Sequence, residues 1–68
     1  MTMKIVLNGE GAEVDKDTSL SKLIEAYRLR PERIAVEVNR QIVSRDKFAS
    51  LSLHEGDEIE IVHMVGGG

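Results

Sequence analysis

The chain has 68 residues, with 12 acidic against 9 basic side chains and a formal net charge of −3. A chain of this length forms one small domain, which buries only about 60% of the surface that its unfolded form exposes. This leaves room for one modest core and little room for a deep catalytic cleft. The length therefore favours a carrier, a binding module or a subunit over an autonomous enzyme.

The composition excludes several kinds of site. The chain has no cysteine, so disulfides, thiolate metal sites and cysteine nucleophiles are ruled out. Its two histidines lack metal-ligand spacing, and we expect no metal site and no permanently bound cofactor. Net acidity and scarce aromatic residues argue against nucleic-acid binding. With no apolar run near the ~20 residues that cross a bilayer, and no signal-peptide pattern, we expect a cytoplasmic protein without membrane contact.

The N-terminal segment has the pattern of a β-hairpin. Met3 to Leu7 is short, β-branched and apolar, as expected of a mostly buried strand. Asn8-Gly9 is the preferred pair for a tight two-residue turn, because both turn residues adopt positive φ. Ala12 to Val14 is then the returning strand.

One amphipathic helix follows the hairpin. Thr18 is its expected N-cap, since the hydroxyl can accept a hydrogen bond from a backbone N–H of the first turn. Apolar residues recur at i, i+3, i+4 and i+7, which predicts one apolar stripe on a helix of about three turns. The members of the stripe are Leu20, Leu23, Ile24 and Tyr27. Pro31 prevents continuation of the helix, because the residue before a proline avoids the α region.

Three more strands are expected in the C-terminal half. Ile34 to Val38 alternates with one apolar face, and Asn39-Arg40 can turn the chain into a short partner strand, Gln41 to Val43. Glu55-Gly56-Asp57 is a further turn signal. The last and longest strand is expected from Glu58 to Val65.

The predicted order of elements is β-β-α-β-β-β, which belongs to the α+β class. We expect a β-grasp (ubiquitin-like) domain over residues 1–65, with a mixed sheet of four to five strands and one main helix. The first and last strands are the most apolar, so they are the best candidates for the centre of the sheet. They can pair in parallel because the helix supplies a long crossover. We expect residues 66–68 to form a flexible glycine tail.

Gly66, Gly67 and Gly68 follow the last strand directly. Glycine has no side chain and loses much conformational freedom when it is ordered, so taken alone this segment could be a frayed end. The alternative interpretation is that the tail takes part in a chemical reaction. An enzyme can thread glycines through a tunnel too narrow for any Cβ and present the Gly68 carboxylate to ATP. Attack of that carboxylate on the α-phosphate then gives an acyl-adenylate.

The whole chain resembles the ThiS family of sulfur carriers, whose sulfur goes into thiazole formation in thiamine biosynthesis. The resembling segments are Ile5–Gly9, Thr18–Ile24, Ala35–Val43, Arg45 and Gly56–Gly68. Each short strand is a weak signal alone, whereas the ordered set with a terminal Gly-Gly is a strong one. The resemblance covers the chain essentially from end to end.

The resemblance implies a cycle in which the chain is a carrier and not an enzyme. An adenylating enzyme of the ThiF type activates Gly68 with ATP, and a sulfur donor protein then converts it to a C-terminal thiocarboxylate. A thiazole synthase of the ThiG type takes up the sulfur. Ser44 and Phe48 stand where the family often has proline and tryptophan. These departures leave the chemistry of the tail untouched, although they could alter the fit to a partner.

The last strand also carries a candidate docking surface. Val62 and Met64 should point away from the sheet face that packs on the helix, and together with Val65 they form an apolar patch beside the tail. We interpret this patch as the docking site for the adenylating enzyme and the synthase. His63 is more typical of a surface or partner-contact residue than of a catalytic one, because one histidine makes no triad.

Three alternatives remain open. The chain could be a MoaD-like sulfur carrier for molybdopterin synthesis, which shares the terminal Gly-Gly. It could be a ubiquitin-like modifier that is joined to lysines of target proteins. It could also be a plain β-grasp interaction module whose glycines are incidental.

Overall fold

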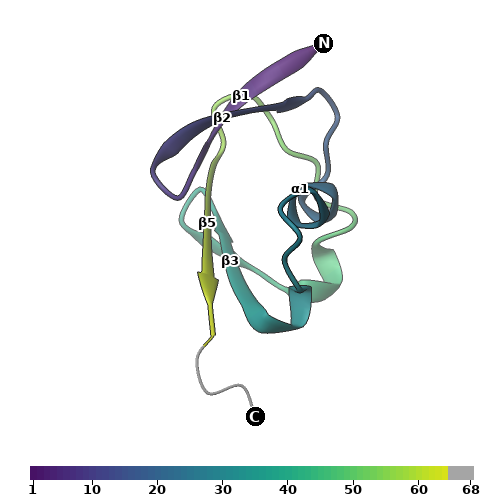
Figure 1. Ribbon diagram of the computed structural model, residues 1–68, viewed down its shortest axis with the longest axis vertical. Helices are drawn as coiled ribbons and strands as arrows, with labels where there is room; N and C mark the ends of the chain where they lie inside the picture. Colours follow the sequence, from purple (N-terminus) through teal and green to yellow (C-terminus); the bar gives the residue numbers. More distant parts are fainter. Residues whose placement is uncertain (65–68) are drawn as a thin grey trace.

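The structure, a computed structural model of the chain, describes residues 1–64. Five strands form one mixed sheet in the order β2-β1-β5-β3-β4, and one α-helix packs across one of its faces (Figure 1). The elements are β1 (Thr2–Leu7), β2 (Glu10–Asp15), α1 (Leu20–Ala26), η1 (Pro31–Arg33), β3 (Ile34–Val38), β4 (Gln41–Val43), η2 (Arg45–Lys47) and β5 (Glu58–His63). The predicted class and order of elements are confirmed. The predicted boundary at residue 65 lies outside the described residues.

Two tight turns shape the two hairpins of the sheet. Asn8 and Gly9 have φ of 51° and 83°, and they join β1 to β2 as the sequence predicts. Asn39 and Arg40 have φ of 52° and 69°, and they join β3 to β4 in the same way. Asparagine tolerates this left-handed region better than most residues, because its short side chain can form local hydrogen bonds.

Strand β5 occupies the centre of the sheet, as the apolar pattern predicts. It pairs in parallel with β1 at only two positions, Val6 with Glu58 and Leu7 with Ile59. It pairs in antiparallel with β3 at every position from Val38 with Ile59 to Ile34 with His63. The C-terminal strand is therefore held more extensively by β3 than by β1.

The two turn asparagines supply side-chain hydrogen bonds to β5. The Oδ1 atom of Asn8 accepts the backbone N–H of Ile61 at 2.8 Å, just beyond the last residue of β1. The Oδ1 atom of Asn39 accepts the backbone N–H of Glu58 at 3.0 Å, and the backbone N–H of Asn39 donates to the Glu58 carbonyl at 2.7 Å. Each turn thus holds the central strand in addition to reversing the chain.

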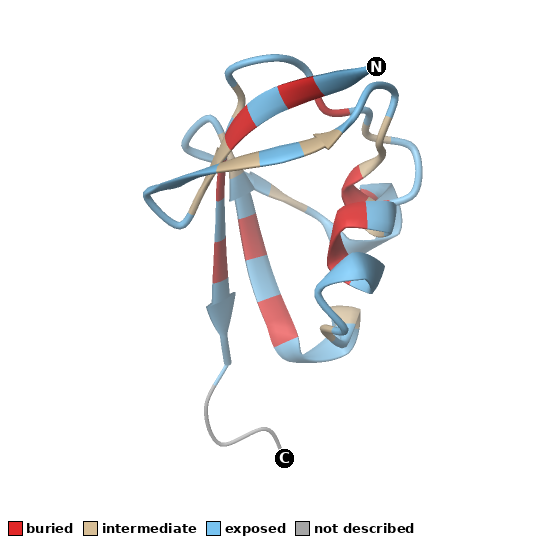
Figure 2. Ribbon diagram, turned by 45° about the horizontal axis from the view of Figure 1, so that its top comes forward, coloured by how far each residue is buried: buried red, intermediate tan, exposed pale blue. Residues whose placement is uncertain are grey.

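The core lies between α1 and the inner face of the sheet. Figure 2 shows the expected alternation of buried and exposed residues along β1, β3 and β5. The fully buried side chains include Ile5, Val36 and Ile59 from the sheet and Leu20, Leu23 and Ile24 from the helix. Phe48 and Leu53 close the core from the long connection before β5. Burying one such side chain contributes about 1.5–3 kcal/mol, which makes this small cluster the main source of stability.

The helix differs from its prediction at both ends. Its N-cap is Ser19, whose Oγ accepts the backbone N–H of Lys22 at 3.1 Å. The predicted cap, Thr18, instead donates its hydroxyl to the carbonyl of Asp15. The hydroxyl of Thr18 therefore serves the preceding turn, and Ser19 is the residue placed to reach the first helical turn.

The helix has seven residues, about two turns, and not the three that were predicted. It ends in a Schellman motif: the N–H of Leu29 bonds the Ile24 carbonyl, and the N–H of Arg28 bonds the Glu25 carbonyl, with Arg28 at φ 57°. Tyr27 becomes the C-cap and stays 49% exposed. Leu29, partly buried against the core, takes the place that the stripe predicted for Tyr27.

The predicted end of the last strand also needs correction, because β5 stops at His63 and not at Val65. Pro31 does not stop the helix, which has already ended, and it instead opens η1. Among residues 1–64, no helix combines the length and apolar character needed to cross a membrane.

The bond from Asn8 to β5 can be tested by substitution. Asn8→Gly keeps the left-handed turn but removes the acceptor for the Ile61 N–H, and it should lower the free energy of unfolding by about 1–3 kcal/mol. Asn8→Asp keeps an acceptor oxygen and should lose clearly less. Urea unfolding followed by circular dichroism measures both values. Equal stability of Asn8→Gly and the parent chain would contradict a stabilising role for this bond.

Candidate functional site

The predicted reactive terminus lies beyond the part of the chain that the structure describes. Gly66, Gly67 and Gly68, and Val65 of the docking patch, all fall outside residues 1–64. Their roles stay predictions. What the structure does place is the end of β5 that leads to them and the surfaces around that end.

The end of β5 is firmly attached to the sheet. His63 forms the last register pair with Ile34, and the N–H of Met64 donates to the carbonyl of Arg33 at 3.0 Å. Ile61, two residues earlier, is only 8% exposed and belongs to the core. The backbone is therefore ordered by core packing and by β3 up to the last described residue.

An exposed apolar patch covers the sheet face opposite the helix, near the end of β5. Val62 is 61% exposed and Met64 is 54% exposed, which confirms that both point away from the core. The register sets Val62 beside Ala35 and Glu60 beside Glu37. We call the exposed residues of this surface the outer patch: Ala35, Glu37, Ile42, Glu60, Val62 and Met64. Its use as a docking site stays a prediction.

Ile42 belongs to this surface and was missed from the sequence. It is 81% exposed and pairs with Glu37 of β3, so it stands on the same face as Glu60. The sequence does contain a signal, because Val43 is partly buried and adjacent strand residues point to opposite faces. Three residues of strand are too few to set that register without the neighbouring strand.

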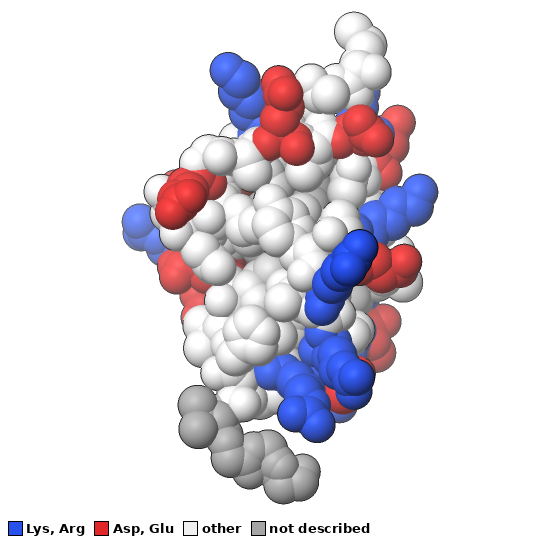
Figure 3. Space-filling model, in the orientation of Figure 1, with Lys and Arg blue, Asp and Glu red and all other residues white. Residues whose placement is uncertain are grey.

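Charges of opposite sign lie near the end of β5. Arg28, Arg30 and Arg33 are all exposed and fall within or beside η1, whose Arg33 carbonyl holds Met64. Figure 3 shows Lys and Arg side chains gathered in the lower right of the view, where Figure 1 places η1. The outer patch instead carries the carboxylates of Glu37 and Glu60. A partner that surrounds the end of β5 therefore meets an acidic, apolar surface on one side and a basic surface on the other.

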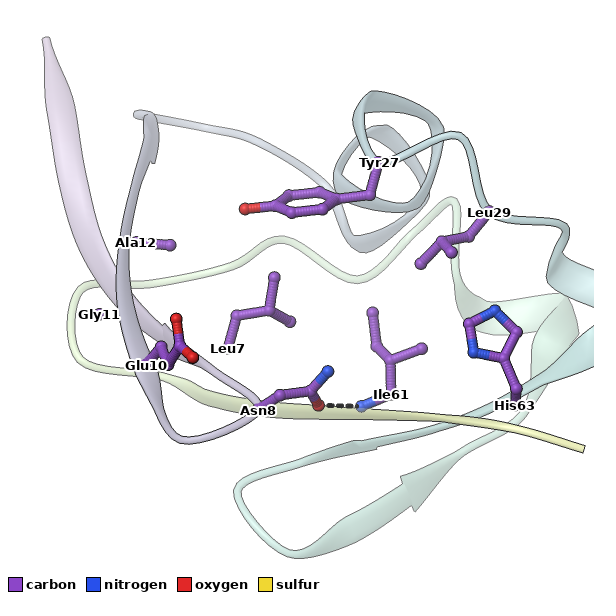
Figure 4. Close-up of a pocket in the computed structure, with 9 residues that line it drawn as sticks. All are labelled: Leu7, Asn8, Glu10, Gly11, Ala12, Tyr27, Leu29, Ile61 and His63. Carbon is purple, nitrogen blue, oxygen red and sulfur yellow. Dashed lines mark hydrogen bonds between the residues drawn. The ribbon is translucent and has the colours of Figure 1, made fainter.

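A hollow of about 350 Å³ lies on the helix side of β5. Its apolar lining comes from Leu7, Tyr27, Leu29 and Ile61, and His63 stands at one end (Figure 4). The remaining lining residues are Asn8, Glu10, Gly11 and Ala12. No serine, threonine or lysine is among the described residues that line it, and the phenol of Tyr27 is the hydroxyl that this lining offers.

The described residues also offer no metal centre, because no group of three or more histidine, aspartate or glutamate side chains is placed to hold an ion within residues 1–64. One acidic turn before β5 is used structurally. Asp57 accepts the backbone N–H of His54 at 2.8 Å and the side-chain amide of Asn39 at 3.1 Å. The described residues near the end of β5 thus form surfaces suited to contact with a partner.

Comparison with known proteins gives the same picture over nearly the whole chain. The sequence model of the ThiS family matches residues 5–68. The sulfur carrier protein ThiS of Bacillus subtilis is 38% identical over 63 residues, which are 91% of this chain and 96% of that protein. The crystal structure of a thiamine biosynthesis protein (ThiS) of Geobacter metallireducens has a TM-score of 0.84 at 28% identity, covering 97% of this chain and 100% of that one.

A longer relative contains a similar segment. A thiazole synthase of Magnetococcus marinus is 44% identical over 66 residues, which are 97% of this chain, yet the chain spans only 20% of the length of that enzyme. The family match takes in the β-grasp domain and the glycine tail together. On this ground, the chain belongs to the ThiS family.

Proposed function

We propose that the chain is the sulfur carrier for thiazole formation in thiamine biosynthesis, and that it holds the sulfur as a thiocarboxylate on Gly68. The match of the ThiS family to residues 5–68, which include the terminal glycines, carries this proposal. The small size and the wholly apolar set of buried core residues support it, because the described residues then offer contact surfaces and no catalytic constellation.

The proposed chemistry begins with activation. A carboxylate oxygen of Gly68 attacks the α-phosphorus of ATP, and pyrophosphate leaves, which gives an acyl-adenylate. The outer sulfur of a persulfide on a donor protein then attacks the carbonyl carbon and displaces AMP, which gives an acyl disulfide between Gly68 and the donor. A thiol reduces the S–S bond of this adduct, and the thiocarboxylate is released as that thiol forms a disulfide with the donor. After the sulfur has been transferred, water supplies the oxygen that restores the carboxylate. An adenylating enzyme of the ThiF type supplies the ATP site, so ATP is consumed and not retained by the carrier.

The proposed partners follow from the same cycle. A ThiG-type synthase is supported by the thiazole synthase that contains a segment similar to this chain. The adenylating enzyme and the sulfur donor are required by the chemistry. We place the docking of the enzymes on the outer patch, where Val62 and Met64 stand next to the residues that lead to the tail. The cytoplasmic location stays a prediction.

The thiocarboxylate can be measured directly. The purified chain, incubated with its adenylating enzyme, ATP and the sulfur donor, should gain the mass that corresponds to replacement of one oxygen by sulfur. Fragmentation should place the change in the C-terminal peptide. Deletion of Gly67 and Gly68 should abolish the change and leave the unfolding transition where it was, because the core lies within residues 3–61.

Other products would point to other functions. Conjugates that join Gly68 to a lysine of another protein would favour the ubiquitin-like modifier. Transfer of the sulfur to a molybdopterin precursor, and not to a thiazole synthase, would favour the MoaD-like carrier. A chain that stays unchanged with its own enzyme would refute the carrier proposal.

The docking role of the outer patch gives a separate prediction. The double variant Val62→Ser/Met64→Ser removes two apolar side chains that are mostly exposed, so the free energy of unfolding should change little. The Kd for the adenylating enzyme should rise at least tenfold, since loss of one buried apolar contact of about 1.4 kcal/mol has that effect. Titration calorimetry measures the Kd. Glu13→Ser, on the remote strand β2, is the matched control and should bind like the parent.

A further inference from the structure

Strand β5 extends past its neighbour β1. The parallel ladder between them ends at Leu7 and Ile59, because the chain turns at Asn8 into the first hairpin. The side chain of Asn8 takes up one more backbone group, the N–H of Ile61. Past that point, β1 provides no partner for β5.

The direction of the remaining backbone groups follows from the antiparallel ladder with β3. The N–H of Asn39 bonds the carbonyl of Glu58, and the N–H of Met64 bonds the carbonyl of Arg33. The backbone N–H and C=O groups of even-numbered residues of β5 therefore point toward β3. Those of odd-numbered residues point toward the side of β5 on which β1 lies. Within the described range, the N–H of His63 donates no hydrogen bond, and the carbonyls of Ile61 and His63 accept none. We call these three groups the open edge.

The hollow of Figure 4 adjoins the open edge on the helix side. Ile61 and His63 contribute both to the edge and to the lining, while Tyr27 and Leu29 stand across from them. A chain that pairs with the edge would place alternate side chains over this hollow. The apolar lining suits an aliphatic or aromatic side chain there.

We propose that the open edge binds an extended segment of the adenylating enzyme as an added strand, with one apolar side chain of that segment in the hollow. The idea rests on the proposed function for the identity of the partner. Unpaired N–H and C=O groups on a strand edge match another extended backbone, which is the basis of recognition by strand addition. Proteins commonly block such edges with proline or lysine, and the described end of β5 has neither.

The position of the edge favours an enzyme that handles the tail over a second copy of the chain. Three backbone groups at about 0.5–1.5 kcal/mol each are too few to hold a stable dimer by themselves. The adenylating enzyme has additional contacts available at the outer patch. His63 precedes Gly66 by three residues in the sequence, so a strand paired with His63 would hold the backbone that leads to the glycines.

A pair of substitutions separates the backbone of His63 from its side chain. His63→Pro removes the N–H and blocks the edge, and the fold should tolerate it because that N–H is not used in the ladder. His63→Ala keeps the N–H and removes the imidazole. The Kd for the adenylating enzyme, measured by calorimetry, should rise at least tenfold for His63→Pro and less than threefold for His63→Ala. Equal losses in the two variants would mean that the side chain matters and the edge does not.

Hydrogen exchange on the unmodified chain gives a test that needs no variant. The His63 amide should exchange quickly in the free carrier and at least tenfold more slowly in the complex with the enzyme and ATP. If the enzyme releases pyrophosphate but the His63 amide stays unprotected, strand addition is wrong and the carrier function stands. If the enzyme forms no adenylate on the chain, the proposed function fails first.

Discussion

The parallel pairing of the first and last strands is the contact on which the rest of this structure depends. It covers only two register positions, yet it joins the N-terminal hairpin to the C-terminal strand and places β5 at the centre of the sheet. The crossover through α1 makes it possible, since parallel strands need a long connection. The hydrogen bond from Asn8 to Ile61 extends this short ladder by one more link.

This arrangement shows how so small a domain can hold its last strand firmly up to the residues that precede the proposed reactive terminus. The last few residues of a domain are often poorly ordered unless they are tied down, whereas here Ile59 and Ile61 of the last strand are core residues paired with β3. The same placement brings three different surfaces to the end of β5: the outer patch, the arginines near η1 and the open edge. In the proposed cycle, an enzyme can hold the carrier from several sides while it works on Gly68.

Much of the fold could be predicted from local chemistry. Asn8-Gly9 predicted the first turn because both residues favour positive φ, and the apolar character of β1 and β5 predicted their central position. The helix boundaries could not be predicted in the same way. Thr18 and Ser19 are both good capping residues, and only the backbone decides between them. Arginine rarely adopts positive φ, so the sequence does not indicate that the helix ends at a left-handed Arg28. The predicted apolar stripe therefore includes Tyr27, which lies just beyond the helix.

The candidate site also has features that follow from local sequence patterns and features that depend on pairing between strands. Alternation along β5 was enough to predict the exposure of Val62 and Met64. Ile42 was missed because its place on the same face depends on pairing with Glu37, a contact between strands that no local pattern contains. The open edge at His63 could not be predicted from the sequence either, since it arises from the stagger of two six-residue strands, in which the end of β1 pairs with the start of β5.

The central claim is that the free α-carboxylate of Gly68 is the reacting group of this carrier. Chemical synthesis can supply the chain with either a carboxylate or an amide at Gly68, with every other atom unchanged. The measurement is pyrophosphate release from ATP by the adenylating enzyme in a single turnover with each form. We expect release with the carboxylate and none above background with the amide, although both forms should unfold alike. Equal release with the two forms would contradict it.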